Sequence, residues 1–439
     1  MAENILTEFD SFFFLGIGGV SMSALAKILY KSGKTVAGCD RSESEYTEEL
    51  ANLGIDVEIA NFCDIEEYDV VVYTDALPEN NPAIIQARRL NKVLMPRGRL
   101  LYEVSRLFNN TVAVAGCHGK TTCTAMIAHV FKAAGKQFSS HIGGSDLTFT
   151  NGYLDGYDYF VTEACEYKKN FLYLKPDIAV ILNSDADHLD CYGTAKNLAD
   201  TYKKFAEGSG EVIKLFGDLE DCNGITFGFD DRATFYAKSI RNVGGKFAFT
   251  AYEGNNELGK VTLSSYGKHN VLNALAAIAV ARCCGIAFED IAEGLKSFKG
   301  VKRRFEKIGE VNGAVCIADY AHHPNEIKAA LKTARLVTRG ELYVVFQPHT
   351  YSRTKNFFKQ FVLVLSQVKR LMVYKTFAAR EYYDDAGSAL TLSKGLKRSV
   401  YGDCETDIEQ FISGAKEGDT VLFLGAGDIY EVAKTVIDG

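Results

Sequence analysis

The chain has 439 residues, a length that suggests about three domains at roughly 150 residues each. Hydrophobic residues make up 47% and charged residues 24%, which is the balance of an ordinary globular protein. The formal net charge of −7 argues against a dedicated nucleic-acid-binding protein. No apolar run reaches the ~18 residues that a membrane-spanning helix needs, and the start of the chain lacks the basic region of a secretory signal. We therefore expect a cytoplasmic protein, monomeric or weakly homodimeric, with no nucleic-acid partner and no membrane insertion.

Eleven cysteines are scattered along the chain, and no two of them form a Cys-x-x-Cys pair. An odd, dispersed set of this kind is typical of reduced thiols and not of a disulfide framework or a zinc site. The chain also has 39 glycines but only 6 prolines, which indicates backbone turns that need room and not a disordered or collagen-like sequence.

Short apolar runs alternate with amphipathic stretches along most of the chain. Apolar residues with helical spacing run from Val20 to Leu29 and recur in a helix predicted over 120–134. Strand–turn–helix units predict mostly parallel sheets covered by helices, so the expected fold class is α/β. Residues 225–266, rich in Thr, Tyr, Phe and Gly, predict short antiparallel strands. The predicted buried strands are 12–15, 35–38, 69–74, 111–115, 159–162, 178–182, 314–318, 342–346, 371–374 and 420–424.

Two polar segments indicate joints between domains. Residues 105–110 (SRLFNN) precede a new strand and a glycine-rich turn, and the basic segment 297–304 (SFKGVKRR) follows a helical stretch. Cutting the chain at these segments gives three domains of ordinary size. The predicted domains are 1–108, 109–299 and 300–439.

A glycine-rich turn, Gly-Ile-Gly-Gly-Val-Ser, follows the first predicted strand. It is similar to the fingerprint of dinucleotide-binding folds, in which glycines let the backbone approach a diphosphate, although Ser21 replaces the third glycine. Two interpretations stay open: a tight structural turn, or a site for the diphosphate of NAD or of a nucleotide-sugar. Arg97 and Arg99 could supply positive charge to such a diphosphate. The fingerprint positions are Gly16, Gly18, Gly19 and, at the end of the second strand, Asp40.

The strongest local signal is the segment 116–122, GCHGKTT, placed between a predicted strand and a predicted helix. Backbone N–H groups in such a loop curl around phosphate oxygens, and the helix N-terminus adds the positive end of its dipole. Lys120 would neutralise the β- and γ-phosphates, and the hydroxyl of Thr121 would bind Mg²⁺. The match to the general phosphate loop is incomplete because Val114 stands at its first glycine. The sequence nevertheless predicts nucleotide binding.

Acidic and imidazole groups follow two further strands. Glu163 ends the strand 159–162, and a second group follows the strand 178–182. Ligands of parallel α/β sheets gather at the carboxyl ends of strands, so these residues should converge on the phosphate loop and complete a magnesium site. On its own, the second group is equally compatible with a solvated turn. Its members are Asp185, Asp187, His188 and Asp190.

Two polar clusters follow strands of the last third of the chain. Residues 319–324 (DYAHHP) follow the strand 314–318, and residues 346–353 (FQPHTYSR) come at the end of the strand 342–346. Arg353 can make a two-pronged hydrogen bond to a carboxylate, and His322 can donate to one or transfer a proton. Together they predict a binding surface.

Nine motifs, in the same order along the chain, resemble those of the Mur ligase family. The resemblance implies three α/β domains: a Rossmann-like N-terminal domain for a UDP-sugar, a central P-loop ATPase with a mostly parallel sheet and a small antiparallel portion, and a Rossmann-like C-terminal domain for an amino acid. The motifs are FLGIGGVSMSALA (14–26), VAVAGCHGKTT (112–122), EACEYKKNFL (163–172), NSDADHLD (183–190), GKHNVLNALAA (267–277), GVKRRFE (300–306), DYAHHPNEI (319–327), FQPHTYSRTK (346–355) and GAGDIYEVA (425–433).

The resemblance also implies roles for individual residues, with ATP and two Mg²⁺ ions as the expected cofactors. The implied ATP-binding residues are Gly116, Cys117, His118, Gly119, Lys120, Thr121, Thr122, His269, Asn270, Asn273, Arg304 and Asp319. Those for the UDP-sugar are Gly16, Gly18, Gly19, Asp40 and Arg97, and the metal ligands are Thr121, Glu163 and His188. The implied catalytic residues are Lys120, His188, His322 and Arg353.

Within the family, the motifs are most similar to the branch that joins L-alanine to the lactyl carboxylate of UDP-N-acetylmuramate through an acyl phosphate, in peptidoglycan synthesis. The alternatives are a recycling ligase that adds a tripeptide to the same sugar nucleotide, and another amide ligase of this type. An NAD-dependent reductase leaves the phosphate loop unexplained, and a P-loop switch protein needs neither UDP-sugar nor amino acid.

Three positions depart from the family pattern. Many relatives have glycine where Ser21 stands and arginine where Thr350 stands, so binding of the alanine carboxylate is expected to depend more on Arg353. Other Mur ligases have a carbamylated lysine near the position of Tyr202, with Lys203 beside it here. The alanine-adding branch lacks that lysine too, which favours this branch.

Overall fold

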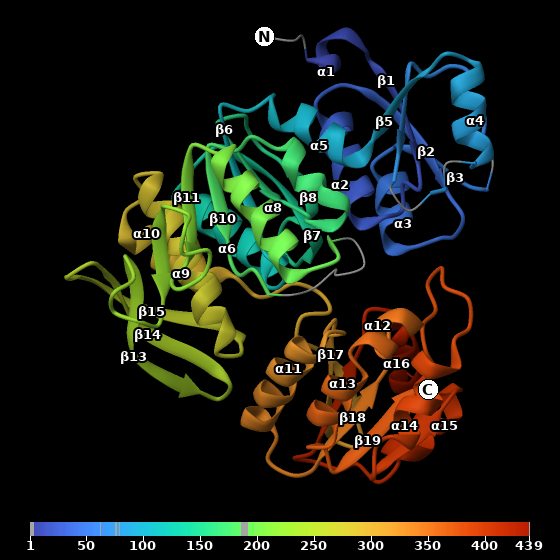
Figure 1. Ribbon diagram of the computed structural model, residues 1–439, viewed down its shortest axis with the longest axis vertical. Coiled ribbons are helices and arrows are strands. Elements are labelled where there is room, and N and C mark those ends of the chain that lie inside the picture. The colour runs from blue at the N-terminus through green and yellow to red at the C-terminus, as the bar shows by residue number, and fades with distance from the viewer. Residues whose placement is uncertain (1–3, 62, 75–76, 79, 186–191, 439) are drawn as a thin grey trace. The chain divides into compact units, whose positions relative to one another are not determined.

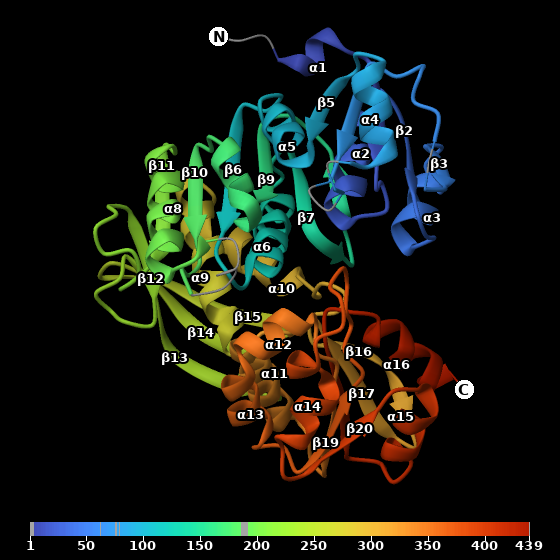
Figure 2. The same ribbon diagram turned by 45° about the vertical axis from the view of Figure 1, so that its right-hand side comes forward.

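The computed structural model describes residues 4–61, 63–74, 77–78, 80–185 and 192–438. Two compact units make up the chain. The first unit comprises Met1–Ile240, Phe249–Thr262 and Asn270–Lys299. The second comprises Arg241–Ala248, Leu263–His269 and Gly300–Gly439. Figures 1 and 2 show the elements in chain order, from blue to red.

The first sheet is parallel, with the strand order β3-β2-β1-β4-β5. This is the doubly wound arrangement, in which the turn after β1 lies where the strand order reverses. Its strands are β1 (Ser11–Leu15), β2 (Thr35–Asp40), β3 (Asp56–Ile59), β4 (Val70–Tyr73) and β5 (Val93–Pro96). Its helices are α1 (Ile5–Glu8), α2 (Val20–Lys31), α3 (Glu45–Asn52), α4 (Pro82–Arg89) and α5 (Arg97–Ser105).

The second sheet has ten strands in the order β15-β14-β13-β12-β11-β10-β6-β9-β7-β8. The strands from β7 to β13 in this order pair in parallel, and β8 is antiparallel to β7. Its strands are β6 (Asn110–Ala115), β7 (Phe138–Asp146), β8 (Thr150–Leu154), β9 (Tyr159–Glu163), β10 (Ile178–Ile181), β11 (Glu211–Leu215), β12 (Ile225–Gly228), β13 (Phe235–Val243), β14 (Lys246–Glu253) and β15 (Asn256–Tyr266). The accompanying helices are α6 (Lys120–Ala133), η1 (Tyr167–Tyr173), α8 (Ala195–Glu207), α9 (His269–Cys283) and α10 (Phe288–Ser297).

The expectation of short antiparallel strands over 225–266 is partly wrong. β12 pairs in parallel with β11, and β13 pairs in parallel with β12. Two-residue connections, Gly244–Gly245 and Gly254–Asn255, then join β13 to β14 and β14 to β15, a length that suits antiparallel hairpins. β13 and β15 are long strands of 9 and 11 residues. The composition indicated strands, but it held no signal for their partners.

The last sheet has the order β16-β17-β21-β18-β19-β20 and is parallel except for β16 at its edge. Apolar clusters cover both of its faces, one around Phe346 and Leu422, the other around Val345 and Phe423. Its strands are β16 (Glu306–Val311), β17 (Ala314–Asp319), β18 (Leu342–Phe346), β19 (Arg370–Tyr374), β20 (Ser399–Gly402) and β21 (Thr420–Leu424). Its helices are α11 (Pro324–Val337), α12 (Tyr351–Asn356), α13 (Phe358–Leu365), η2 (Asp385–Gly387), α14 (Ala389–Lys394), α15 (Glu405–Ile412) and α16 (Ile429–Asp438).

These sheets confirm the predicted α/β class with mostly parallel strands. Ten strands coincide with predicted apolar runs to within two residues: β1, β2, β4, β6, β9, β10, β17, β18, β19 and β21. The apolar runs did not predict β3, β5, β11, β16 or β20. β7 and β8 were not predicted, because polar and glycine residues such as those of Ser139–Gly144 interrupt their apolar pattern. Among the described residues, no helix is both long and apolar enough to cross a membrane.

Helix α2 of the first sheet packs on β7 and β8 of the second (Figure 1). The amide of Asn151 in β8 donates to the Val20 carbonyl oxygen at 2.6 Å, and the buried ammonium of Lys27 donates to Asn151 Oδ1 at 2.6 Å. Gly152 lets the two backbones meet, since a Cβ there would lie 2.7 Å from the Ala24 carbonyl oxygen. The two sheets therefore share one apolar core within the first unit.

We expect Gly152→Ala to lower the free energy of unfolding by about 1–3 kcal/mol, because the new methyl group presses on backbone atoms that cannot rotate away. Thermal melting followed by circular dichroism measures the effect. The matched control is Gly208→Ala at the end of α8, where φ is −83° and the nearest atoms lie 3.6 Å from the new Cβ. Equal melting temperatures for the two variants would contradict the role assigned to Gly152.

Candidate active site

The phosphate loop joins β6 to the N-terminus of α6, as the sequence predicted. Gly119 caps the helix with φ at 86°, in the left-handed region that favours glycine. A Cβ at this position would also lie 2.6 Å from Asn273 Oδ1, so the loop has no room for a side chain there. Thr121 follows in the first turn and is buried. The sequence thus places a tight backbone turn and a hydroxyl at the positive end of a 14-residue helix.

Lys120 is the charged centre of this loop. Its ammonium donates to the Gly116 carbonyl oxygen at 2.6 Å and to Glu166 Oε1 at 3.0 Å. Burial opposes the charge on Lys120, but the carboxylates of Glu166 and Glu163 outweigh it and raise the lysine pKa above its ordinary range. Lys120 therefore keeps its positive charge at physiological pH, although little of it reaches solvent.

Glu163 lies at the end of β9, next to the root of the phosphate loop. The parallel pairing of β9 with β6 sets Glu163 opposite Val114, two residues before Gly116. Its buried carboxylate accepts a hydrogen bond from the Gly143 amide at 2.5 Å. A buried carboxylate beside the loop of Thr121 fits Mg²⁺, which prefers hard oxygen ligands.

The other predicted metal ligands are placed only in part. His188, Asp187 and Asp190 lie outside the described residues. Asp185 is described, and its Oδ2 lies 3.6 Å from His118 Nε2.

Side chains from neighbouring strands and helices brace the loop. Asn183, just after β10, accepts from the His118 amide at 3.1 Å and donates back to its carbonyl oxygen at 2.9 Å. Cys117 Sγ lies 3.6 Å from the hydroxyl of the fully buried Tyr202. On α9, Asn273 donates to Asn270 Oδ1 at 2.8 Å. The structure thus brings Asn273 to the loop at Gly119, and Asn270 is linked to the loop through Asn273.

The N-terminal glycine turn is fastened by Asp40. Its Oδ2 accepts from the Gly18 amide at 2.9 Å, and its Oδ1 accepts from the Arg41 amide at 2.8 Å. The Gly16 amide donates to the Cys39 carbonyl oxygen at 2.8 Å, and Gly19 is the N-cap of α2. Arg97 begins α5 at the same carboxyl edge of the sheet. Arg99 points elsewhere, since it is exposed and pairs with Glu103 at 2.5 Å.

In the second unit, His322 and Arg353 meet through a histidine that was not predicted. The ring centroids of His322 and His349 lie 5.7 Å apart, and Arg353 Nη1 lies 3.1 Å from His349 Nδ1. Burial and the nearby His322 and Arg353 lower the pKa of His349 to about 3, so this imidazole is neutral. Thr350 caps α12 with φ at 68°, a strained value for a β-branched residue, and starts the helical turn that carries Arg353.

Arg304, Asp319 and His269 form a second group of this unit. The Asp319 carboxylate accepts from the amides of Phe305 at 2.9 Å and Ala321 at 2.8 Å. Burial raises the pKa of Asp319 to about 6 despite the opposing charge of Arg304. Burial and the same arginine lower the pKa of His269 to about 4, so its ring is neutral at pH 7.

Sequence reasoning missed two side chains of these groups. Glu166 is the counter-ion of Lys120 and is 1% exposed, and His349 contacts Arg353. Glu166 lies three residues after Glu163 in the motif 163–172, and His349 lies four residues before Arg353 in the motif 346–355. A second carboxylate in one motif and an imidazole at a strand end were the available signals.

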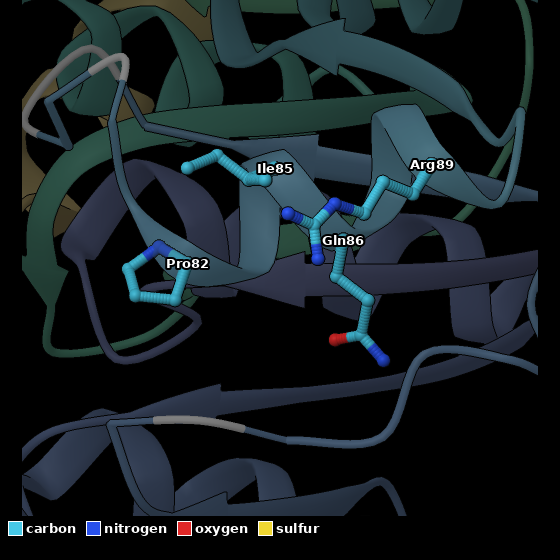
Figure 3. A pocket seen from close by; sticks show the side chains of 4 residues that line it. All are labelled: Pro82, Ile85, Gln86 and Arg89. Atoms are coloured by element: carbon cyan, nitrogen blue, oxygen red, sulfur yellow. The ribbon is translucent and has the colours of Figure 1, made fainter.

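A surface pocket of about 420 Å³ lies on α4 (Figure 3). Its lining residues share one helical face at spacings of three and four, and none is a predicted site residue. They are Pro82, Ile85, Gln86 and Arg89.

Comparisons with known proteins agree with the motif order. The model of the Mur ligase family, catalytic domain, matches residues 11–109, the Mur ligase middle domain matches 114–281, and the Mur ligase, glutamate ligase domain matches 303–427. The UDP-N-acetylmuramate–L-alanine ligase of Clostridium beijerinckii is 38% identical over 455 residues, which cover 99% of each chain.

Two solved structures share the fold. The UDP-N-acetylmuramate–alanine ligase MurC of Thermotoga maritima matches with a TM-score of 0.85 and 29% identity over 98% of both chains. A murein peptide ligase of Psychrobacter arcticus matches with a TM-score of 0.76 and 24% identity, over 97% of this chain and 98% of that one. With three matched domains and relatives that align from end to end, this chain belongs to the Mur ligase family.

Proposed function

We propose that this chain is an ATP-dependent ligase that joins L-alanine to the lactyl carboxylate of UDP-N-acetylmuramate in peptidoglycan synthesis. The observation that carries the proposal is the charged phosphate loop, in which Lys120 pairs with Glu166 and keeps its charge in the field of the Glu166 and Glu163 carboxylates. The name and end-to-end alignment of the Clostridium relative support the choice of substrates.

The loop residues bind and orient the triphosphate. Backbone amides of 116–122 donate to phosphate oxygens. The Lys120 ammonium leaves its contact with Glu166 and contacts the β- and γ-phosphates instead. Thr121, Glu163 and His188 would hold Mg²⁺, with two ions expected. The metal supplies positive charge that offsets the charge of the phosphates during transfer. Asn270, Asn273, His269, Arg304 and Asp319 complete the ATP contacts, as the family resemblance implies.

The chemistry proceeds in two steps that need no covalent bond to the protein. A lactyl carboxylate oxygen attacks the γ-phosphorus of ATP, the bond to the β–γ bridging oxygen breaks, and ADP leaves from an acyl phosphate. The alanine amine then attacks the acyl carbon, loses a proton and expels inorganic phosphate. Positioning and charge neutralisation carry such transfers, which matches a site with a buried cation.

The two remaining substrates have separate binding groups. The glycine turn of Gly16, Gly18 and Gly19, fastened by Asp40, faces the diphosphate of the UDP-sugar, and Arg97 supplies the positive charge. Arg353, steadied by the neutral His349, binds the carboxylate of alanine, and His322 lies beside them to donate a hydrogen bond. Because Thr350 offers no charge where many relatives have arginine, Arg353 is the main cation for that carboxylate.

We also propose domain boundaries, a cellular location and an oligomeric state for the protein. We assign the UDP-sugar, ATP and amino-acid roles to domains 1–108, 109–299 and 300–439. We place the enzyme in the cytoplasm, as a monomer or weak homodimer.

We expect phosphate release from ATP only when UDP-N-acetylmuramate and L-alanine are both present. The assay scans amino acids and the tripeptide of the recycling reaction one at a time, with product mass as a second readout. Equal release without an amino acid, or release with the tripeptide alone, would contradict the proposal.

We expect Lys120→Ala to reduce turnover by roughly 10²–10³-fold, because the transition state loses its main protein cation. Calorimetry should still show normal binding of UDP-N-acetylmuramate. The matched control is Lys132→Ala on the same helix, whose ammonium is about half exposed and pairs with Asp155 at the surface. Comparable losses in both variants would remove the special role of Lys120.

We expect Arg353→Ala to raise the KM for L-alanine by about 10-fold to 100-fold, since a charge-assisted hydrogen bond to the carboxylate is lost. The KM values for ATP and the UDP-sugar should change little. Lys355→Ala, two residues along and paired with Asp384 at 2.9 Å, is the control. An unchanged KM for alanine in Arg353→Ala would assign its carboxylate to another cation.

A further inference from the structure

The residue that replaces the third fingerprint glycine makes a connection between the first two sheets. Ser21 Oγ accepts a hydrogen bond from Arg97 Nη1 at 3.1 Å and lies 2.7 Å from His141 Nε2 in β7. In the dinucleotide fingerprint a glycine serves here for close packing of helix and strand. In this chain the serine side chain instead joins an arginine of its own sheet to a histidine of the next.

The donors and acceptors of this connection favour one arrangement of protons. When Thr162 gives its hydroxyl proton to the Glu163 carbonyl oxygen at 3.1 Å, it accepts from His141 Nδ1, 3.0 Å away. A neutral imidazole protonated at Nδ1 has a bare Nε2, which accepts from the Ser21 hydroxyl. Arginine nitrogens only donate, so the chain runs in one direction from Arg97 to the Glu163 carbonyl.

His141 is suited to hold a serine beside an arginine. It is 2% exposed, and burial together with the positive charge of Arg97 lowers its pKa to about 3. The ring is therefore neutral at physiological pH and does not repel the guanidinium. The strand of His141, β7, is also linked to the phosphate-loop site, because the amide of Gly143, two residues after His141, donates to the Glu163 carboxylate.

We propose that Ser21 and His141 are positioning residues for the sugar nucleotide, which hold the guanidinium of Arg97 in place for the diphosphate. The inference rests on the proposed function, in which Arg97 binds the UDP-sugar. An arginine at the carboxyl edge of a sheet samples many rotamers, and a hydrogen bond from one Nη removes that freedom before the ligand arrives. The remaining guanidinium nitrogens then donate to the phosphate oxygens.

The test measures binding of UDP-N-acetylmuramate by calorimetry together with steady-state kinetics. We expect Ser21→Ala to weaken the Kd and raise the KM for the UDP-sugar by about tenfold, the scale of one hydrogen bond to a charged group. The kcat and the KM for ATP should stay within about twofold of wild type. Ser21→Thr, which keeps the hydroxyl, should restore most of the binding.

Two further variants separate positioning from stability. Ser32→Ala, at the other end of α2, removes a hydroxyl that donates to the Leu29 carbonyl oxygen, and it should leave the Kd unchanged. In an Arg97→Ala background, Ser21→Ala should cause no further loss, because Ser21 acts through Arg97.

The outcomes are distinguishable. If the wild-type protein does not bind UDP-N-acetylmuramate, the proposed function fails. If it binds but Ser21→Ala binds equally well, the function stands and the inference is overturned. A lower melting temperature with an unchanged Kd also overturns it, because the serine would then join the sheets without orienting Arg97. Independent losses from Ser21→Ala and Arg97→Ala would have the same meaning.

Discussion

The parallel pairing of β6 with β9 and β10 is the constraint on which the central site depends. Parallel strands end at the same edge of a sheet, so the register that sets Glu163 opposite Val114 also brings a carboxylate to the root of the phosphate loop. On the other side, the residues after β10 carry Asn183 to the backbone of His118. No single segment contains this site. It exists because apolar runs far apart in sequence are buried side by side.

A second constraint is the close union of the first two sheets. Gly152 allows the backbone of β8 to approach α2, and a buried lysine, Lys27, bonds across the junction. Glu49, Asn151 and Thr150 all contact this ammonium and offset the cost of burying its charge. The glycine turn and the phosphate loop therefore belong to one compact unit, although they lie in different sheets.

Local chemistry was predictable from the sequence, whereas long-range pairing was not. The glycine-rich loop before Lys120 and the capping turn at Gly119 have residue types that few other local structures require. The sequence correctly predicted that this loop connects a strand to the start of a helix. β12 and β13 were expected in antiparallel pairs, yet β12 pairs in parallel with both β11 and β13, since the choice of partner depends on segments elsewhere in the chain. His141 carried no signal at all, because a histidine in a polar strand gains its meaning only from Ser21, 120 residues away.

In the phosphate loop, Glu166 and a bound nucleotide would compete for the same Lys120 ammonium. Glu166 is nearly excluded from water, and its main-chain oxygen is also held by the hydroxyl of Tyr192. A nucleotide that draws Lys120 away must leave a buried carboxylate without its cation or move it toward another. The affinity for nucleotide is then a difference between two strong attractions to the same ammonium group. In the proposed function, an acidic residue beside the phosphate site weakens the hold of Lys120 on the phosphates and so favours their release once the reaction is complete.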